Sequence, residues 1–317
     1  MAETVSRESG IGGTDIAAIV GVSPYKTRWD VYADKRGLAE PVEVTTRMKV
    51  GILQQPTVVR LYEEETGDIV AWSDETIRHP KEEWIVGTPD GFIAHEPGPG
   101  ELLFKKDGSR RLIVELEAPG FEAKTAGLDQ AWRWGENQDD IPEEYIIQCQ
   151  WYMVLTGRKR WVVAALIGGD RFRFHVLDAD EEFQAMLVRE GERFWKEYVA
   201  RGKQPDFDHG RSARAYIKRL FPTASKTVRE AGAVELEAMR ELAGVNRELS
   251  YLDKRKATLV TRIESMIGSD YAIESREEGL KAIWYGQKES TYQVTRPAGR
   301  VFRLYDKRRG NDDDGGY

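Results

Sequence analysis

Glu122 and Lys124 stand two residues apart in the short segment FEAKTAG, residues 121–127. In an extended strand, side chains at positions i and i+2 point to the same face, so the carboxylate and the ammonium group would lie side by side while Ala123 turns away. Such a pair can be an ordinary ion pair, or it can bind and orient reacting groups. The choice depends on what else the fold brings to this strand.

Asp90 is a second acidic residue that could take part. It lies in the segment VGTPDGFI, 32 residues before Glu122. Pro-Asp-Gly by itself is a common turn, because proline fixes φ, aspartate bonds to its own backbone and glycine accepts positive φ. Carboxylates that converge from two neighbouring strands also form a hard-oxygen site for Mg²⁺ or Mn²⁺, and a lysine beside them can orient or help deprotonate a water. The three residues together indicate metal-dependent hydrolysis.

Glu115 and Glu117 are rival acids in the apolar segment before residue 121. Neither is followed by lysine two residues later, because Glu115 is followed by Glu117 and Glu117 by Pro119. Both are predicted to be carboxylates on a strand surface, although Glu117 could contribute to the field at a metal.

Other catalytic chemistries lack their residues. The sequence has no phosphate-cradling G-x-x-x-x-G-K-[ST] loop and no G-x-S-x-G elbow. No pair at the spacing of zinc ligands occurs among the four histidines, His79, His95, His175 and His209. Cys149 is the only cysteine, which excludes an internal disulfide and a cysteine-based metal cluster. These absences favour a hydrolase that depends on a divalent ion.

Composition says less about what the protein binds and where in the cell it acts. The net charge of −7 does not exclude a nucleic-acid enzyme, because affinity for phosphates depends on where Lys and Arg cluster. The longest apolar runs, such as WVVAALI, are far shorter than the ~20 residues of a membrane-spanning helix, and the first residues are polar. We therefore expect a location in the cytoplasm of a bacterial host.

The first two thirds of the chain are predicted to form an α/β core. Residues 10–67 indicate three helices, TDIAAIV with Thr14 as its N-cap, TRWDVYADKRG, and TVVRLYEEETG. The period then changes, and strands are predicted at IVAW, WIVGTPDGFI, RRLIVELE and FEAK. A helix over 143–157, the strands WVVAALIGG and RFRFHVL, and a long amphipathic helix from DEEFQAM onward complete the core.

The C-terminal third has a different composition. Apolar residues at 242, 249, 252, 259, 263 and 266 follow a three-four rhythm on a charged background, which predicts a long helix or a helical hairpin. Short strands are predicted at KAIWYG, TYQVT and RVFRLY. The expected organisation is a core over 1–209, a C-terminal appendage over 210–305 and a disordered tail over 306–317. The appendage could pack on the core, form oligomers or bind a partner.

Five blocks of this sequence resemble the phage recombination exonucleases of the lambda-exonuclease and YqaJ type, in the PD-(D/E)xK nuclease superfamily. The blocks are GIGGTDIAAIVGVSPYKT, GILQQPTVVRLYEEETG, TPDG, EAKTAG and IPEEYIIQCQWYMVLTG, in this order. The resemblance covers roughly residues 7–205. It implies a restriction-endonuclease-like core with a central mixed sheet flanked by helices.

The resemblance also implies roles for individual residues. Asp90, Glu122 and the backbone carbonyl of Ala123 would bind the metal, and Lys124 would position the attacking water. Gln148 and Tyr152 match the glutamine-x-x-x-tyrosine motif of related nucleases, and at i and i+4 they share one helix face. They could contact the reacting groups, or they could simply pack beside the sheet.

Gln55 departs from the family pattern. The family usually has glutamate at this position, before the proline. An amide oxygen can still bind a metal or hold a metal-bound water, but it lacks the negative charge, so affinity for a second cation is expected to fall. The departure bears on whether one metal ion or two are bound.

The resemblance further implies a pocket for the 5′ phosphate of DNA, formed here by Arg7, Thr14 and Thr88. An arginine supplies a charge-assisted bidentate contact, and a helix N-terminus attracts phosphate as well.

The function implied is a Mg²⁺-dependent 5′–3′ exodeoxyribonuclease, with Mn²⁺ as a possible substitute. It would degrade one strand of linear duplex DNA and leave 3′ single-stranded tails for phage homologous recombination. The implied partners are duplex DNA ends, a single-strand annealing protein of the same phage and further copies of the chain in a homotrimer. The alternatives are an endonuclease or nickase with the same centre, and a catalytically weakened protein that binds DNA ends.

Overall fold

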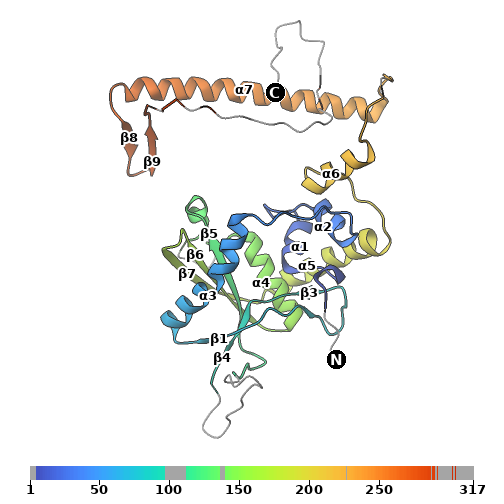
Figure 1. The fold of residues 1–317 in the computed structure, drawn as a ribbon, viewed down its shortest axis with the longest axis vertical. Coiled ribbons are helices and arrows are strands. Elements are labelled where there is room, and N and C mark those ends of the chain that lie inside the picture. Colours follow the sequence, from blue (N-terminus) through green and yellow to red (C-terminus); the bar gives the residue numbers. More distant parts are fainter. Residues whose placement is uncertain are drawn as a thin grey trace. The chain divides into compact units, whose positions relative to one another are not determined.

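The computed structural model describes residues 5–96, 112–135, 140–225, 227–286, 288–289, 291, 302 and 304 (Figure 1). The chain divides into two compact units, Met1–Leu220 and Phe221–Tyr317. The first unit contains all the residues that the sequence marks as chemically important.

A mixed five-stranded sheet forms the centre of the first unit. Its strands, in spatial order, are β1 (Ile69–Trp72), β4 (Gly91–Ala94), β5 (Gly120–Ala126), β6 (Arg160–Ile167) and β7 (Arg171–Asp178). Neighbours run antiparallel except for β5 and β6, which are parallel. A separate pair joins β2 (Ile77–Arg78) to β3 (Val86–Gly87). The α/β class with a central mixed sheet, expected from the sequence, is confirmed.

Both faces of the sheet are covered, and β6 shows this most clearly. Its odd-numbered residues from Trp161 to Ile167 join one apolar core, and its even-numbered residues from Val162 to Leu166 join another. A strand buried on both faces is expected to be an uninterrupted apolar run, as WVVAALI is. The first core is closed by α1 (Gly13–Ile19), α2 (Arg28–Lys35), α4 (Glu143–Thr156) and α5 (Glu181–Phe194), which continues as a π-helical turn over Trp195–Ala200. The second core is closed by α3 (Thr46–Thr66).

Two helix starts differ from the sequence prediction. The N-cap of α1 is Gly12, whose N–H donates to the Asp15 carboxylate at 3.1 Å, so Thr14 lies inside the first turn. The third predicted helix, expected to begin at Thr57, begins eleven residues earlier at Thr46 and contains Pro56. The Thr45 hydroxyl accepts from the Met48 N–H there, and this cap begins the helix upstream.

The predicted strand RRLIVELE is wrong within the described residues. Ile113 makes only an isolated bridge with His95, and a turn follows in which the Ala118 N–H donates to the Glu115 carbonyl. Pro119 comes next and has no N–H to donate to a strand ladder. The central strand therefore begins at Gly120, after the apolar segment rather than within it.

The last helix of the first unit is α6 (Arg211–Leu220), which packs on α2 through the buried Ala213. Two short 3₁₀ turns, Arg7–Ser9 and Leu128–Arg133, complete this unit.

The second unit contains α7 (Ala233–Ile267), one continuous helix of 35 residues rather than a helical hairpin. An antiparallel pair follows, β8 (Ala272–Ser275) and β9 (Leu280–Ile283), and β9 overlaps the first half of the predicted strand KAIWYG. The predicted strands TYQVT and RVFRLY and the tail 306–317 lie outside the described residues, apart from Thr291, Phe302 and Leu304.

No helix in the described part of the chain is both long enough and apolar enough to cross a membrane.

Gly120 provides a test of how tightly β5 packs. A Cβ added at Gly120 would overlap the indole ring of Trp161, which is fully buried. We predict that Gly120→Ala destabilises the protein by roughly 1–3 kcal/mol, because the ring has no room to move aside. Denaturant unfolding followed by tryptophan fluorescence measures the change.

Gly51→Ala is the matched control, since Gly51 lies inside α3 and, among the described residues, its added Cβ would meet only the Thr125 hydroxyl, at ordinary contact distance. Alanine there favours the helix by about 1 kcal/mol. Equal stability of the two variants would contradict the tight packing of Gly120 against Trp161.

Candidate active site

The side chains of Glu122 and Lys124 lie side by side on the face of β5 that meets α4. Lys124 Nζ is 2.6 Å from Glu122 Oε1 and 3.0 Å from the side-chain oxygen of Gln148 on α4. Ala123, between them, is buried in the opposite core under α3. The alternation expected from an extended segment is therefore present, and the pair faces a helix rather than solvent.

Asp90 reaches the same point from the neighbouring strand. It immediately precedes β4, which pairs with β5 through Gly91 and Phe121. One Asp90 oxygen accepts the backbone N–H of Ala123 at 2.9 Å, and the other accepts the side-chain amide of Gln55 at 3.3 Å. The sheet thus holds the carboxylates of Asp90 and Glu122 in one cluster, with Gln55 of α3 beside them.

Gln148 and Tyr152 of α4 complete the cluster. The Gln148 amide donates to Glu122 Oε1 at 2.7 Å and to the Tyr152 hydroxyl oxygen at 3.0 Å. The Tyr152 hydroxyl donates to the Thr88 carbonyl at 3.2 Å. Because Gln148 and Tyr152 are one helical turn apart, a single face of α4 connects the Glu122 carboxylate to the segment that precedes Asp90.

Burial dominates the electrostatics of the cluster. Glu122 is 3 % exposed, and burial raises the pKa of its carboxyl to about 7 although Lys124 acts in the opposite direction. Burial also raises the pKa of Asp90, against the lowering effect of Lys124 and of the Ala123 N–H. Burial alone would lower the pKa of Lys124, but the Glu122 and Asp90 carboxylates outweigh it and raise that pKa. Lys124 therefore stays protonated and carries the only positive charge in direct contact with Glu122 within the described structure.

The donor set fits a hard divalent cation. Glu122 Oε2 is buried and has no hydrogen-bond partner among the described residues, and an unpaired buried carboxylate oxygen is costly unless an ion or water meets it. Carboxylate and amide oxygens of Asp90, Glu122 and Gln55 are the ligands that Mg²⁺ prefers. Among the described residues, no three side chains of the His, Cys, Asp or Glu types converge on one point. The amide of Gln55 stands where a third acid would complete such a group.

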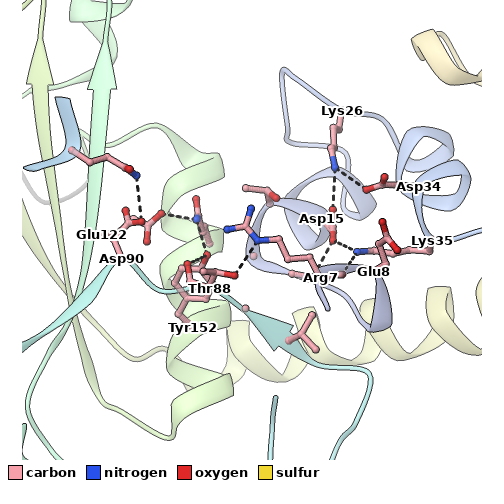
Figure 2. Close-up of a pocket in the computed structure, with 17 residues that line it drawn as sticks. Arg7, Glu8, Asp15, Lys26, Asp34, Lys35, Thr88, Asp90, Glu122 and Tyr152 are labelled. Atoms are coloured by element: carbon pink, nitrogen blue, oxygen red, sulfur yellow. Dashed lines mark hydrogen bonds and ion pairs between the residues drawn. The ribbon is translucent and has the colours of Figure 1, made fainter. Parts of the chain in front are cut away.

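A pocket with a volume of about 260 Å³ opens beside the cluster. The Asp90 and Glu122 carboxylates lie at one end, and Asp15, Lys26, Asp34 and Lys35 lie at the other (Figure 2). The Arg7 side chain extends between the two ends and donates from Nε to the Thr88 hydroxyl at 3.0 Å.

All three residues expected to bind a 5′ phosphate line this pocket. Arg7 and Thr88 are hydrogen-bonded to each other, and Thr14 contributes from the first turn of α1. Thr88 is also 2.8 Å from the Thr76 hydroxyl. The pocket therefore combines a guanidinium group, two hydroxyls and a helix N-terminus beside the carboxylate cluster.

Lys35 and Asp15 are among the pocket residues that the sequence analysis missed. The Lys35 side chain is almost fully buried, and its Nζ lies 2.8 Å from Asp15 and donates to the Arg7 carbonyl at 2.7 Å. Asp15 also accepts the N–H of Gly12, the N-cap of α1, so Lys35 ties the start of α1 to the segment that carries Arg7. Lys35 stands four residues after the buried Val31, and this helical spacing was the available signal that it points inward.

The rival acids lie elsewhere. Glu115 and Glu117 are both exposed and do not line the pocket. Glu115 pairs with the exposed His95 side chain at 3.1 Å.

Residues 5–159 match the sequence profile of the YqaJ-like viral recombinase domain. This span contains the whole carboxylate cluster and the three residues that would bind a phosphate. The uncharacterised protein YqaJ of Bacillus subtilis (strain 168) is 25 % identical over 265 residues, which cover 82 % of this chain and 76 % of that protein.

Two solved structures are similar at a lower level. The alkaline exonuclease LHK-Exo of Laribacter hongkongensis is 17 % identical with a TM-score of 0.44, over 62 % of this chain and 90 % of that one. A phage-related exonuclease of Haemophilus somnus 129PT is 13 % identical with a TM-score of 0.37, over 61 % and 96 %. These likenesses are weak, so the assignment rests on the sequence matches. The two sequence matches confirm the resemblance expected from the five blocks: residues 5–159 match the YqaJ-like viral recombinase domain, and 82 % of the chain is similar to YqaJ.

Proposed function

We propose that this protein is a metal-dependent DNA exonuclease that degrades one strand of linear duplex DNA from its 5′ end and leaves 3′ single-stranded tails for phage homologous recombination. The observation that carries the proposal is the meeting of Asp90, Glu122 and Lys124 in one cluster, beside a pocket that presents Arg7. Its context is a YqaJ-like viral recombinase domain.

Asp90, Glu122 and the Ala123 carbonyl would hold Mg²⁺, or Mn²⁺ in its place, with the Gln55 amide beside them. A bound divalent cation supplies a polarised phosphate and a water of lowered pKa. Gln55 carries no charge, and this favours a weaker hold on any second cation.

The chain's own residues have separable tasks in this proposal. Lys124 donates a hydrogen bond to the attacking water and holds it in line with the scissile bond. Gln148 fixes both Lys124 and Glu122 through its side-chain amide, and Tyr152 fixes Gln148. These three contacts set the orientation of the cluster before substrate arrives, which is where much of the catalytic advantage of an enzyme lies.

Arg7, Thr14 and Thr88 would grip the terminal 5′ phosphate. The guanidinium offers charge-assisted hydrogen bonds, the two hydroxyls offer neutral ones, and the N-terminus of α1 adds its dipole. A phosphate held there would place the next phosphodiester near Glu122, since both ends line one pocket.

The proposed partners are duplex DNA ends and a single-strand annealing protein of the same phage, with the protein acting in the bacterial cytoplasm as a homo-oligomer, a trimer by family resemblance. Two alternative functions use the same residues. An endonuclease or nickase would cut without needing an end. A weakened protein that binds DNA ends is favoured by one specific observation, the neutral Gln55 beside Asp90.

Digestion of labelled DNA tests the proposal. We expect linear duplex to lose label from its 5′ ends in the presence of Mg²⁺, with a 5′ phosphate degraded faster than a 5′ hydroxyl because only the phosphate pairs with Arg7. Covalently closed circles should stay intact. Cleavage of closed circles would support the endonuclease instead, and binding to ends without release of nucleotides at any Mg²⁺ or Mn²⁺ concentration would support the weakened protein.

Lys124→Ala tests the lysine. We predict that it lowers the cleavage rate by about 10²–10³-fold, the range typical for loss of one positioned hydrogen-bond donor, while binding to duplex ends is retained. Single-turnover digestion and a DNA-binding titration measure the two effects. Lys159→Ala is the control, because Lys159 lies on the exposed surface and pairs only with Glu181 in the described structure. Retained turnover in Lys124→Ala would remove this residue from the mechanism.

Gln55→Glu tests the departure from the family pattern. The new carboxylate would face Asp90, so we predict lower thermal stability without divalent ions and a larger rise in melting temperature on adding Mg²⁺ than in the wild type. Thermal denaturation across a Mg²⁺ titration measures both. Gln54→Glu, one residue away, controls for the added charge. The same dependence of melting temperature on Mg²⁺ concentration in Gln55→Glu and wild type would mean that Gln55 takes no part in binding the cation.

A further inference from the structure

Helix α7 has an apolar stripe with a strict seven-residue repeat. We call it the α7 seam, and its members are Leu242, Val245, Leu249, Leu252, Leu259, Ile263 and Met266. The steps between successive positions alternate between three and four once Lys256, the one charged residue in the series, is included. This spacing is that of the a and d positions of a coiled coil, with Leu242, Leu249, Lys256 and Ile263 at a.

The seam is exposed within the described structure. Six of its seven members, from Val245 to Met266, are between 38 and 58 % exposed. A helix of 35 residues is about 52 Å long, and an uncovered leucine stripe of that length is unfavourable in water. Isolated helices are also marginal without a packed face, so the pattern calls for a second helix.

Charged residues beside the seam indicate which helix this is. The position before each a residue is occupied by Glu241, Glu248, Arg255 and Arg262, so acids occupy the first half of the helix and bases the second. None of these side chains makes an ion pair in the described part of the chain, and all four are exposed. A partner that satisfies them must present the same charges in reverse order.

A second copy of α7 running antiparallel presents that order. Glu241 then faces Arg262 of the second copy and Glu248 faces Arg255, and each pair occurs twice because the arrangement is two-fold symmetric. The apolar layers agree with this register, with Leu242 beside Leu259 of the second copy. The register is centred close to the middle of Ala233–Ile267, so the two helices overlap along almost their whole length.

A parallel pair fits worse. There each of the four flanking residues faces the position five residues later on the other copy, which brings Glu248 against Asp253 and forms no attractive pair. Lys256 would also meet its own copy across the seam. In the antiparallel register, Lys256 lies beside Val245, where its aliphatic stem can cover the seam while its ammonium group reaches solvent.

We propose that α7 binds α7 of a second copy of this chain as an antiparallel two-stranded coiled coil. This interaction goes beyond the proposed nuclease function and does not depend on it. The apolar seam supplies the association, and the four flanking charges select the antiparallel orientation, because exposed ion pairs contribute more to specificity than to affinity.

Charge reversal in the full-length chain tests the pairing. Arg255→Glu with Arg262→Glu makes the flank entirely acidic, and Glu241→Arg with Glu248→Arg makes it entirely basic. We expect the mass measured by sedimentation equilibrium to fall twofold relative to wild type for each double variant alone, and to be restored when the two are mixed. Circular dichroism checks that the helix is still folded.

Arg240→Glu with Lys254→Glu is the matched control, because both residues are exposed on the side of α7 away from the seam and the change in charge equals that of the acidic variant. It should keep the wild-type mass. A wild-type mass that none of these substitutions alters, or a mixture that fails to recover it, would overturn the proposal in favour of another occupant of the seam, such as a helix of a different protein.

Disulfide trapping tests the orientation. The single native thiol, Cys149, is buried and does not compete. We expect Glu241→Cys and Arg262→Cys to form a linked dimer only when the two variants are mixed, because equal positions lie about 31 Å apart in the antiparallel register. Linkage within each variant alone would contradict the antiparallel register, and absence of linkage in the mixture would also contradict the proposal.

Discussion

Glu122 is a carboxylate buried in the middle of a sheet, and its neighbours are arranged to keep it there. One of its oxygens receives both the Lys124 ammonium group and the Gln148 amide, while the other has no partner among the described residues. A buried charge is tolerated only when it is paired, and even then burial raises the pKa of Glu122 to about 7. The other residues of the cluster are arranged around this carboxylate, which has a partner at only one of its two oxygens. Gln148, Tyr152 and Asp90 are each held in place by hydrogen bonds that lead back to β5. These bonds fix the side chains of the cluster, while Glu122 Oε2 is left without a hydrogen-bond partner among the described residues.

The two ends of the pocket are built by different kinds of secondary structure. The carboxylate end is built on regular elements, β4, β5 and α4, whose backbones fix their side chains through sheet register and helical spacing. The end beyond Arg7 is built on a short 3₁₀ turn and the beginnings of α1 and α2, where the buried Lys35 links the Arg7 carbonyl to Asp15. Burial alone would raise the pKa of Asp15, but Lys35 and Lys26 outweigh it and lower that pKa, so Asp15 stays charged and the link stays ionic. Thr88 contacts both ends, through its hydroxyl to Arg7 and through its carbonyl to Tyr152.

The two units differ in how far they bury their apolar side chains. The first surrounds its sheet with helices on both faces and leaves little of the β6 side chains in contact with water. The second has one long helix whose apolar side chains stay exposed, and within its described residues only Ala243 and Ile267 of α7 are buried. In general a buried polar site is held rigid by the fold around it, whereas a heptad seam is stabilised by packing against a second helix. The same chain thus combines a self-sufficient core with a surface suited to association.

The sequence by itself determined the α/β class, most of the strands and helices of the first unit, and the neighbours Glu122 and Lys124, because alternation and helical spacing are local properties. It also singled out Asp90, Gln55, Gln148 and Tyr152, through the resemblance of the blocks in which they lie. Only the tertiary structure decided that these residues, spread from position 55 to 152, meet at one point, that the apolar segment before Pro119 is a turn, and that Lys35 is buried against Asp15. Local pattern could not supply these results, because strand pairing and burial depend on contacts between residues far apart in the chain, and a charged residue at an inward helical position looks the same in sequence as one at the surface.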